Sequence, residues 1–518
     1  MISMRRVTVD RPPAPPIGHR RRWSDHVLRQ RRARRTWPTR PPPRAAPRWR
    51  AAAVGGHEAL LPPRPAGPGV GPGDATGRSS VTFGQVASPG TGARGAGAGR
   101  PGHNIRLVPR TILPGTGRAI RLFKTWFWRP PRPHGDAIID RRVSPLELLY
   151  DLVYVAVISQ AGRSLAADIS LMGLAGFAVV FSLTWIAWAN GSLYLELHGR
   201  SDGRTRTFVF VQIGILAVLA VFAGDAGNRG GTAFALTYAA FLAVMTLLWY
   251  AVRRQDVTHR PELLADTGRY VITMAASVLA MVASAFLTER ARLVVWAVVA
   301  IGWIALVLLM GRSRAGLGRG MAPTDSLVER FGTFTIVVLG EVVFGVVNGL
   351  SLADRDIETI STGMVALVLG FGFWWIYFDV VGGRLPKGDG RALANWILGH
   401  YPIVLSIAAA GAGMVSLVEH AHDPRTPVAS AWLLSGAVAV GLIATIVTSR
   451  ALADASRLAA VYRALQIAMA LGAVVSIVIG LTRPAPWLLV LLLVLVLVLV
   501  WAIAIRGFLL AGAWGAER

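Results

Sequence analysis

One carboxylate stands in the middle of an otherwise apolar stretch. Residues 326–350 read SLVERFGTFTIVVLGEVVFGVVNGL, and Glu341 lies about 18 Å beyond Glu329 along a helix that rises 1.5 Å per residue. A charged side chain at the centre of a membrane-spanning helix costs roughly 2.5–3.5 kcal/mol, so it normally faces the protein interior. We expect Glu341 to face a polar cavity entered from the cytoplasm and to bind a proton or cation there. The alternative is a protonated glutamate that only fastens two helices together.

Other polar side chains stand near the ends of apolar stretches. Glu147 and Asp151 are four residues apart, so they share one face of a helix. Arg330 begins a stripe on its own helix that ends at Glu341. With Glu341 alone at the bilayer midplane and the others in the cytoplasmic third, the predicted substrate or ion pathway consists of Glu147, Asp151, Glu329, Arg330, Glu341, Asp379 and His400.

The sequence contains no recognisable catalytic motif. It has no cysteine, which excludes disulfides and thiolate chemistry, and it has no serine-hydrolase, zinc-protease, phosphate-loop or dinucleotide pattern. The stretch EHAHD places His420 and His422 near two carboxylates, a spacing that could chelate a metal. That pattern is short, so we expect no metal site, no cofactor, no catalytic residue and no enzymatic activity.

The elements that position these residues are membrane helices. The chain is 53% hydrophobic, with a mean hydropathy of +0.50. From Ser144 onward, apolar stretches of about 20 residues follow one another, each long enough to cross a hydrocarbon core of about 30 Å. We expect an all-α, polytopic bundle of twelve transmembrane helices at 145–166, 171–195, 206–224, 232–252, 269–288, 293–311, 327–349, 361–381, 396–418, 428–449, 458–481 and 485–508.

The positive charges predict the orientation of this bundle. Alternate loops hold three or more Arg or Lys residues, and the loops between them hold no more than two. Cytoplasmic loops of membrane proteins are enriched in Lys and Arg. We therefore expect a multi-pass protein of the cell membrane with both termini in the cytoplasm.

A motif recurs in the two halves of the apolar body. Asp202-Gly203-Arg204 lies between the second and third spans, and Asp389-Gly390-Arg391 lies between the eighth and ninth. Trp188 and Trp375 precede these triplets by the same number of residues. The pattern favours two six-helix repeats in the same orientation, an architecture found among transporters.

The N-terminal part differs in composition and carries most of the net charge of +26. Residues 1–104 are rich in Arg, Pro and Gly, with too few apolar residues to form a core, so we expect a disordered tail. Residues 105–142 include RAIRLFKTWFWR, typical of a basic amphipathic helix in the headgroup layer. We expect the bilayer as partner, with anionic lipid as a ligand of the tail. The alternative is a passive tail, and we expect no nucleic-acid partner.

Four motifs carry a family resemblance. They are SPLELLYDLVYVAVISQ (144–160), LVERFGTFTIVVLGEVV (327–343), WWIYFD (374–379) and GHYPIVLSIAAAGAG (399–413). In this order, the segment 143–510 resembles the bacterial low temperature requirement protein A family. The resemblance implies a multi-pass membrane protein linked by name to growth in the cold, and it assigns no chemical role to any residue.

Two hypotheses about function follow. The first is a transporter or ion-permeable protein for a small ion or solute, in which Glu341 is the titrating or coordinating group. The second is a non-transporting membrane scaffold or cold-stress sensor, in which the intramembrane carboxylates only hold helices together.

Overall fold

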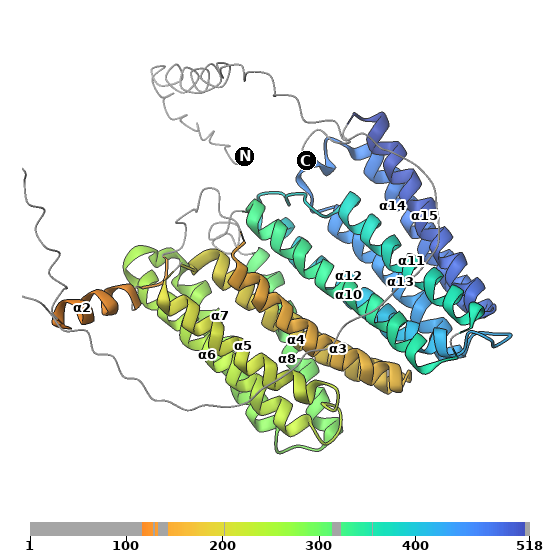
Figure 1. The fold of residues 1–518 in the computed structure, drawn as a ribbon. Coiled ribbons are helices and arrows are strands. Elements are labelled where there is room, and N and C mark those ends of the chain that lie inside the picture. The colour runs from red at the N-terminus through yellow and green to blue at the C-terminus, as the bar shows by residue number, and fades with distance from the viewer. Residues whose placement is uncertain are drawn as a thin grey trace, which may run out of the picture. The chain divides into compact units, whose positions relative to one another are not determined.

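The computed structural model describes residues 116–127, 130–132, 143–200, 202–312, 323–354 and 356–512. The predicted tail, residues 1–104, lies outside the described residues, as does most of the predicted segment 105–142. The described chain folds into helices joined by short loops, and it contains no β-strand (Figure 1).

All twelve predicted spans are helices, with ends within a few residues of the expected positions. Among the described residues, eleven helices are long and apolar enough to cross a membrane. The remaining long helix is α3, which carries Glu147, Asp151 and Arg163. The helices are α3 (Pro145–Ala167), α4 (Leu171–His198), α5 (Gly203–Ala223), α6 (Gly231–His259), α7 (Leu264–Ser284), α8 (Glu289–Arg312), α10 (Asp325–Leu352), α11 (Ile357–Val380), α12 (Gly390–Glu419), α13 (Val428–Ser449), α14 (Ala459–Thr482) and α15 (Pro486–Leu510).

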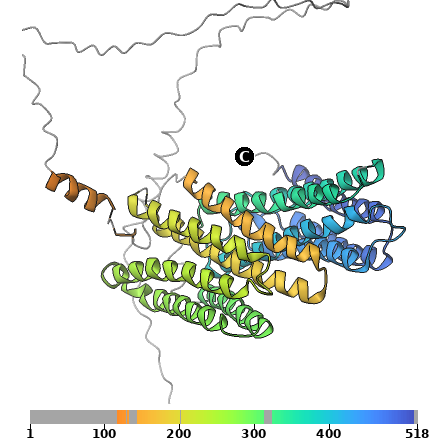
Figure 2. The same cartoon turned by 60° about the horizontal axis from the view of Figure 1, so that its bottom comes forward.

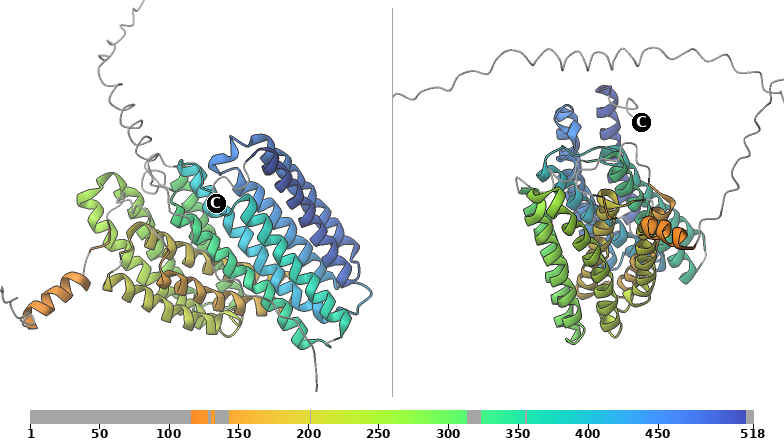
Figure 3. Two further views of the ribbon diagram at one scale, coloured as in Figure 1. Left: turned by 45° about the horizontal axis from the view of Figure 1, so that its top comes forward. Right: turned by 90° about the vertical axis from the view of Figure 1, so that its left-hand side faces the viewer.

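The two sets of six helices pack in the same order. In α3–α8 and again in α10–α15, the first helix contacts the second and third, and the third, fourth, fifth and sixth follow as neighbours. The sixth helix of each set also contacts the second helix of that set. Figures 1 and 2 show the long helices running roughly parallel to one another, and Figure 3 shows α10–α15 side by side. Two parallel six-helix repeats would give this arrangement.

The recurring Asp-Gly-Arg triplet has a local structural role. Asp202 is the N-cap of α5, and its side chain accepts a hydrogen bond from the backbone N–H of Thr205. Asp389 caps α12 in the same way through the N–H of Ala392. Such a cap satisfies one of the free N–H groups at a helix start. The triplets therefore mark the same point, the start of the third helix, in each half.

The halves meet through a small set of helices. α3, α4 and α8 of the first half contact α12, and α3 and α4 also contact α10. Within the second half, α10 and α12 approach closely where Gly345 faces Gly411, because a Cβ on Gly345 would lie 2.0 Å from the carbonyl oxygen of Gly411. Small residues allow such backbone contact between membrane helices. The junction of α3, α10 and α12 lies beside this contact.

A short helix precedes the bundle. α2 (Thr116–Phe127) has Phe123 and Trp126 on its exposed surface. Further along, the guanidinium of Arg132 donates to the backbone oxygen of Glu196 at 2.7 Å, and the carbonyl of Arg132 contacts the ring of His198. These bonds tie the segment before α3 to the end of α4.

Candidate functional site

A buried ion-pair cluster joins the first helices of the two halves. Arg330 of α10 is 0% exposed, and it contacts Glu147 at 2.8 Å and Asp151 at 3.2 Å, both on α3. Trp188 of α4 donates its indole N–H to the same oxygen of Asp151 at 2.8 Å. Ser144, the N-cap of α3, donates to Glu147 at 3.0 Å. Glu147 and Asp151 share one face of α3, as their spacing predicts, and both pair with Arg330.

Aromatic side chains separate this cluster from the middle of the bundle. The ring of Trp188 stacks on Phe334 with centroids 3.9 Å apart, and it meets Phe331 edge to face at 4.9 Å. Phe334 and Val338, which follow Arg330 along α10, are each 1% exposed. A buried apolar layer thus lies between the ion pairs and Glu341.

Glu341 lies just beyond the midpoint of α10 and faces α3, as predicted for an inward-facing carboxylate. It is 7% exposed and accepts a hydrogen bond from the hydroxyl of Ser159 at 2.6 Å. Its other carboxylate oxygen lies 3.8 Å from the position a Cβ would take on Gly162. A Cβ there would make an ordinary contact with the carboxylate, which stands against the first helix of the other half.

A cavity of about 410 Å³ reaches this carboxylate. It is lined by α3, α10 and α12, and its polar groups come from Ser159, Gln160, Arg163, Glu341 and Asn348. Arg163 is exposed, one turn beyond Ser159 on α3. The apolar part of the wall is formed by Leu152, Val155, Ala156, Ala166, Phe344, Ala412 and Val415, with Gly162, Gly345 and Gly411 at the closest helix contacts.

The predicted entry from the cytoplasm stays a prediction. From Glu341 the lining extends to Asn348 on α10 and to Val415 on α12, toward the C-terminal ends of those helices, and on α3 it runs back to Leu152. The ion-pair cluster lies near the N-terminal ends. Inside the bundle, buried Phe334 and Val338 lie between Arg330 and Glu341 along α10.

The other predicted pathway residues lie apart from this cavity. Buried His400 contacts the carbonyl of Trp396 at 2.7 Å and the hydroxyl of Tyr377 at 3.1 Å. A neutral ring that donates through Nδ1 and accepts through Nε2 satisfies both contacts. Along α12 it stands eleven residues before Gly411, or about 16 Å. His400 does not line the cavity at Glu341, and its role in a pathway stays a prediction.

Asp379 and Glu329 lie at two other places in the bundle. Asp379, at the end of α11, accepts a hydrogen bond from the indole of Trp501 on α15 at 2.8 Å. Glu329 lies on the exposed side of α10, next to the buried Arg330. A role for either residue in a pathway stays a prediction, and neither lines the cavity at Glu341.

Comparison with known families decides where this architecture belongs. Residues 142–502 match the family described as bacterial low temperature requirement A protein. The chain belongs to this family. An uncharacterized protein of Rhizobium meliloti (strain 1021) is 26% identical over 305 residues, which is 54% of this chain and 70% of that relative. No solved structure matches the chain. The resemblance drawn from four motifs is confirmed.

In this member of the low temperature requirement A family, the histidines of EHAHD do not converge. His420 turns back to the carbonyl of Ser416 at 2.8 Å. His422 reaches across to the start of α11, where it contacts Asp356 at 2.7 Å and Glu358 at 3.0 Å. No three His, Asp or Glu residues in the described part of the chain are placed to hold a metal ion.

Sequence reasoning missed several residues around Glu341. Ser159 continues the face of Asp151 by two helical turns, so extending that stripe would have found it. Arg163 was counted only as a loop charge. Trp188 served as a repeat marker, and nothing in the sequence indicated that its indole bonds Asp151.

Proposed function

We propose that this protein moves a small ion or solute across the membrane and that Glu341 binds the transported cation or a coupled proton. The observation that carries the proposal is a polar cavity that ends on one carboxylate near the middle of a membrane-spanning helix. Burying such a group is costly, and intramembrane carboxylates commonly mark ion and proton paths.

The surroundings of Glu341 would allow a proton or an ion to pass between its carboxylate and the cavity. One carboxylate oxygen is held by Ser159 and the other faces the side of Gly162. Gln160 and Asn348 add amide groups to the cavity wall, and Arg163 adds a cation nearer its end. A hydrated ion or a small polar solute would find several hydrogen-bonding partners there.

The closed end of the path supports an alternating-access mechanism. On the far side of Glu341, the layer of Trp188, Phe334 and Val338 and the Arg330 ion pairs lie between helices of the two halves. Rocking of one half against the other would open this side, as in transporters built from repeats. In the orientation predicted from the loop charges, the cavity then faces outward and the closed layer lies toward the cytoplasm.

The test compares two chemically identical changes on one helix. Purified protein is reconstituted in liposomes, and uptake of protons and of a panel of monovalent cations is measured for wild type, Glu341→Gln and Glu329→Gln. We expect Glu341→Gln to lower the flux at least tenfold and Glu329→Gln, on the exposed side of α10, to leave it unchanged. Equal flux from wild type and Glu341→Gln would refute the role of Glu341.

The competing hypothesis is a scaffold or cold-stress sensor, and one contact favours it. The hydrogen bond from Ser159 to Glu341 joins the two halves, which is what a fastening carboxylate would do. A scaffold predicts no flux from any variant and a lower unfolding temperature for Glu341→Gln. The liposome assay and a thermal unfolding curve together separate the two hypotheses.

A further inference from the structure

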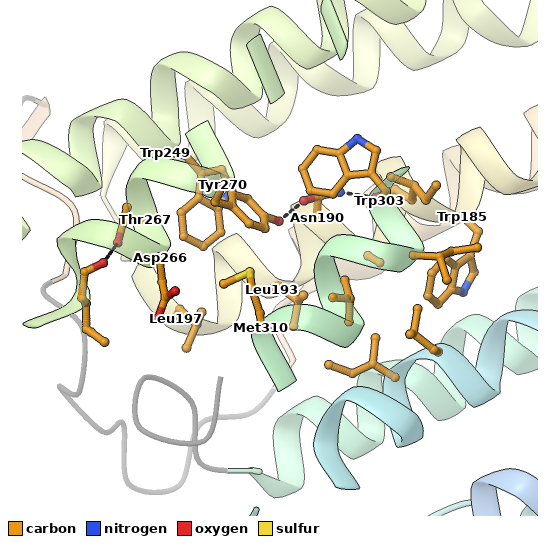
Figure 4. A pocket seen from close by; sticks show the side chains of 17 residues that line it. Trp185, Asn190, Leu193, Leu197, Trp249, Asp266, Thr267, Tyr270, Trp303 and Met310 are labelled. Carbon is orange, nitrogen blue, oxygen red and sulfur yellow. Dashed lines mark hydrogen bonds between the residues drawn. The ribbon is translucent and has the colours of Figure 1, made fainter. Parts of the chain in front are cut away.

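A second pocket, separate from the Glu341 cavity, lies in the seam between the halves. Figure 4 shows it between α4, α6, α7 and α8, with Trp185, Trp249 and Trp303 in its walls. α12 of the second half closes one side through Ile397 and Leu398. Its volume is about 90 Å³.

Most polar groups of this pocket have hydrogen-bond partners, and among the described residues the buried indole N–H of Trp185 is the exception. Tyr270 donates its hydroxyl to Asn190, whose amide nitrogen donates to the carbonyl of Ile186 at 2.8 Å. Thr267 donates to Asp256 at 2.8 Å, and Arg269 donates to Asp266 at 3.0 Å. A buried water needs two to four polar partners, and a polar solute needs comparable contacts. Apart from the indole N–H of Trp185 the remaining wall is apolar, so the pocket suits a largely apolar occupant.

The length of the pocket matches one leaflet of a bilayer. On α4 it runs from Trp185 to Leu197, twelve residues or about 18 Å. Leu197 is one residue from the end of that helix. Half of a hydrocarbon core is about 15 Å thick. The pocket therefore extends from the level of the helix ends to the middle of the membrane.

The pocket communicates with the lipid-facing surface. Ile304, Val307 and Met310 of α8 line it and are only partly buried, and their neighbour Leu309 is 62% exposed. The end of α8 is closed against α12, because a Cβ on Gly311 would lie 2.6 Å from the Cβ of Ala394. An occupant thus enters sideways from the bilayer between the helices.

We propose that this pocket holds one acyl chain of a phospholipid from the leaflet at the C-terminal end of α8. The bilayer is the only apolar material in contact with that opening, and the pocket has the length of a single chain. The polar end, with Asp266 and its partner Arg269, lies at the depth of the headgroup. A chain lodged here would fill the seam across which α12 contacts α4 and α8.

Quenching of tryptophan fluorescence tests this proposal. The protein in detergent micelles is titrated with phosphatidylcholine carrying dibrominated acyl chains, at a lipid fraction low enough that detergent covers the outer surface. We expect saturable quenching, because three tryptophans line the pocket. Val307→Phe, which fills the pocket, should weaken the apparent affinity at least fivefold.

The control is Val298→Phe on the lipid-facing side of the same helix, at a residue 63% exposed, and it should bind like wild type. Linear, non-saturable quenching of wild type would overturn the proposal whether or not the variants fold. Equal affinity of Val307→Phe and Val298→Phe, with equal unfolding temperatures, would also overturn it.

Discussion

Two carboxylate environments in one membrane body differ sharply. Near the N-terminal ends of α3 and α10, Glu147 and Asp151 share the guanidinium of Arg330 and are closed off from water. Farther along the same two helices, Glu341 has the hydroxyl of Ser159 and an open cavity. The same pair of helices thus holds two carboxylates in ion pairs and a third beside a cavity.

The difference indicates which carboxylate can exchange a proton or ion. A buried carboxylate bound to an arginine is held in place, and changing its partner is costly. A carboxylate beside water-sized space and neutral hydrogen-bond donors can change its ligand without rebuilding its surroundings. We therefore assign the ion pairs to closure between the halves and Glu341 to exchange.

Breaking the ion pairs of Arg330 should have the largest effect on stability. Arg330→Gln leaves two carboxylates buried without their cation, so we expect the free energy of unfolding to fall by about 3–5 kcal/mol. Thermal unfolding in detergent measures this, with Arg312→Gln at the exposed end of α8 as the control. Adding Glu147→Gln and Asp151→Asn removes the unpaired charges and should restore part of the loss. Wild-type stability of Arg330→Gln would contradict the assignment.

A change beside Glu341 should instead alter transport. Ser159→Ala removes the hydroxyl 2.6 Å from Glu341, a bond to a charged group worth about 1.5–3 kcal/mol if the carboxylate is ionised. We expect a flux reduced several-fold, less than for Glu341→Gln, while Ser159→Thr keeps the hydroxyl and most of the flux. Flux from Ser159→Ala equal to wild type would show that this bond does not position the carboxylate for exchange.

The smallest effect on stability is expected at the exposed carboxylates Asp356 and Glu358, which contact His422. The pKa of His422 is raised, first by its hydrogen bond to Glu358 and then by the nearby Asp356. The pKa of Asp356 is lowered, mainly by the hydrogen bond from the backbone N–H of Thr359. Stability from a histidine with a raised pKa is full below the unfolded pKa and is lost as pH rises through the folded pKa.

The stability difference between wild type and His422→Gln should therefore shrink as pH rises from about 5 to about 9. Unfolding temperatures across that range measure it. Because His422, Asp356 and Glu358 are about half exposed, the difference should be small and should fall further with added salt. A stability difference that grows with pH would contradict the raised pKa of His422.

The helices could be predicted from the sequence, and their contacts could not. Length and hydropathy are local properties, so all twelve long helices were predicted, eleven of which are apolar enough to cross a membrane, and the cost of burying Glu341 predicted that it faces inward. The pairing of Arg330 with α3 joins residues about 180 positions apart, and no periodicity contains that information. The shape of the cavity depends on how α10 and α12 meet at Gly345 and Gly411, which no local pattern in the sequence predicts.

Access to Glu341 from one side only is the central claim, and the natural absence of cysteine allows a direct test. Single substitutions Asn348→Cys, in the cavity wall, and Phe334→Cys, in the closed layer, are treated in sealed vesicles with a membrane-impermeant thiol reagent applied to either side. The mass of the purified protein then reports labelling. We predict that Asn348→Cys is labelled only from the side of the α10 C-terminus and that Phe334→Cys is labelled from neither. Labelling of Asn348→Cys from the opposite side, or ready labelling of Phe334→Cys, would contradict the account.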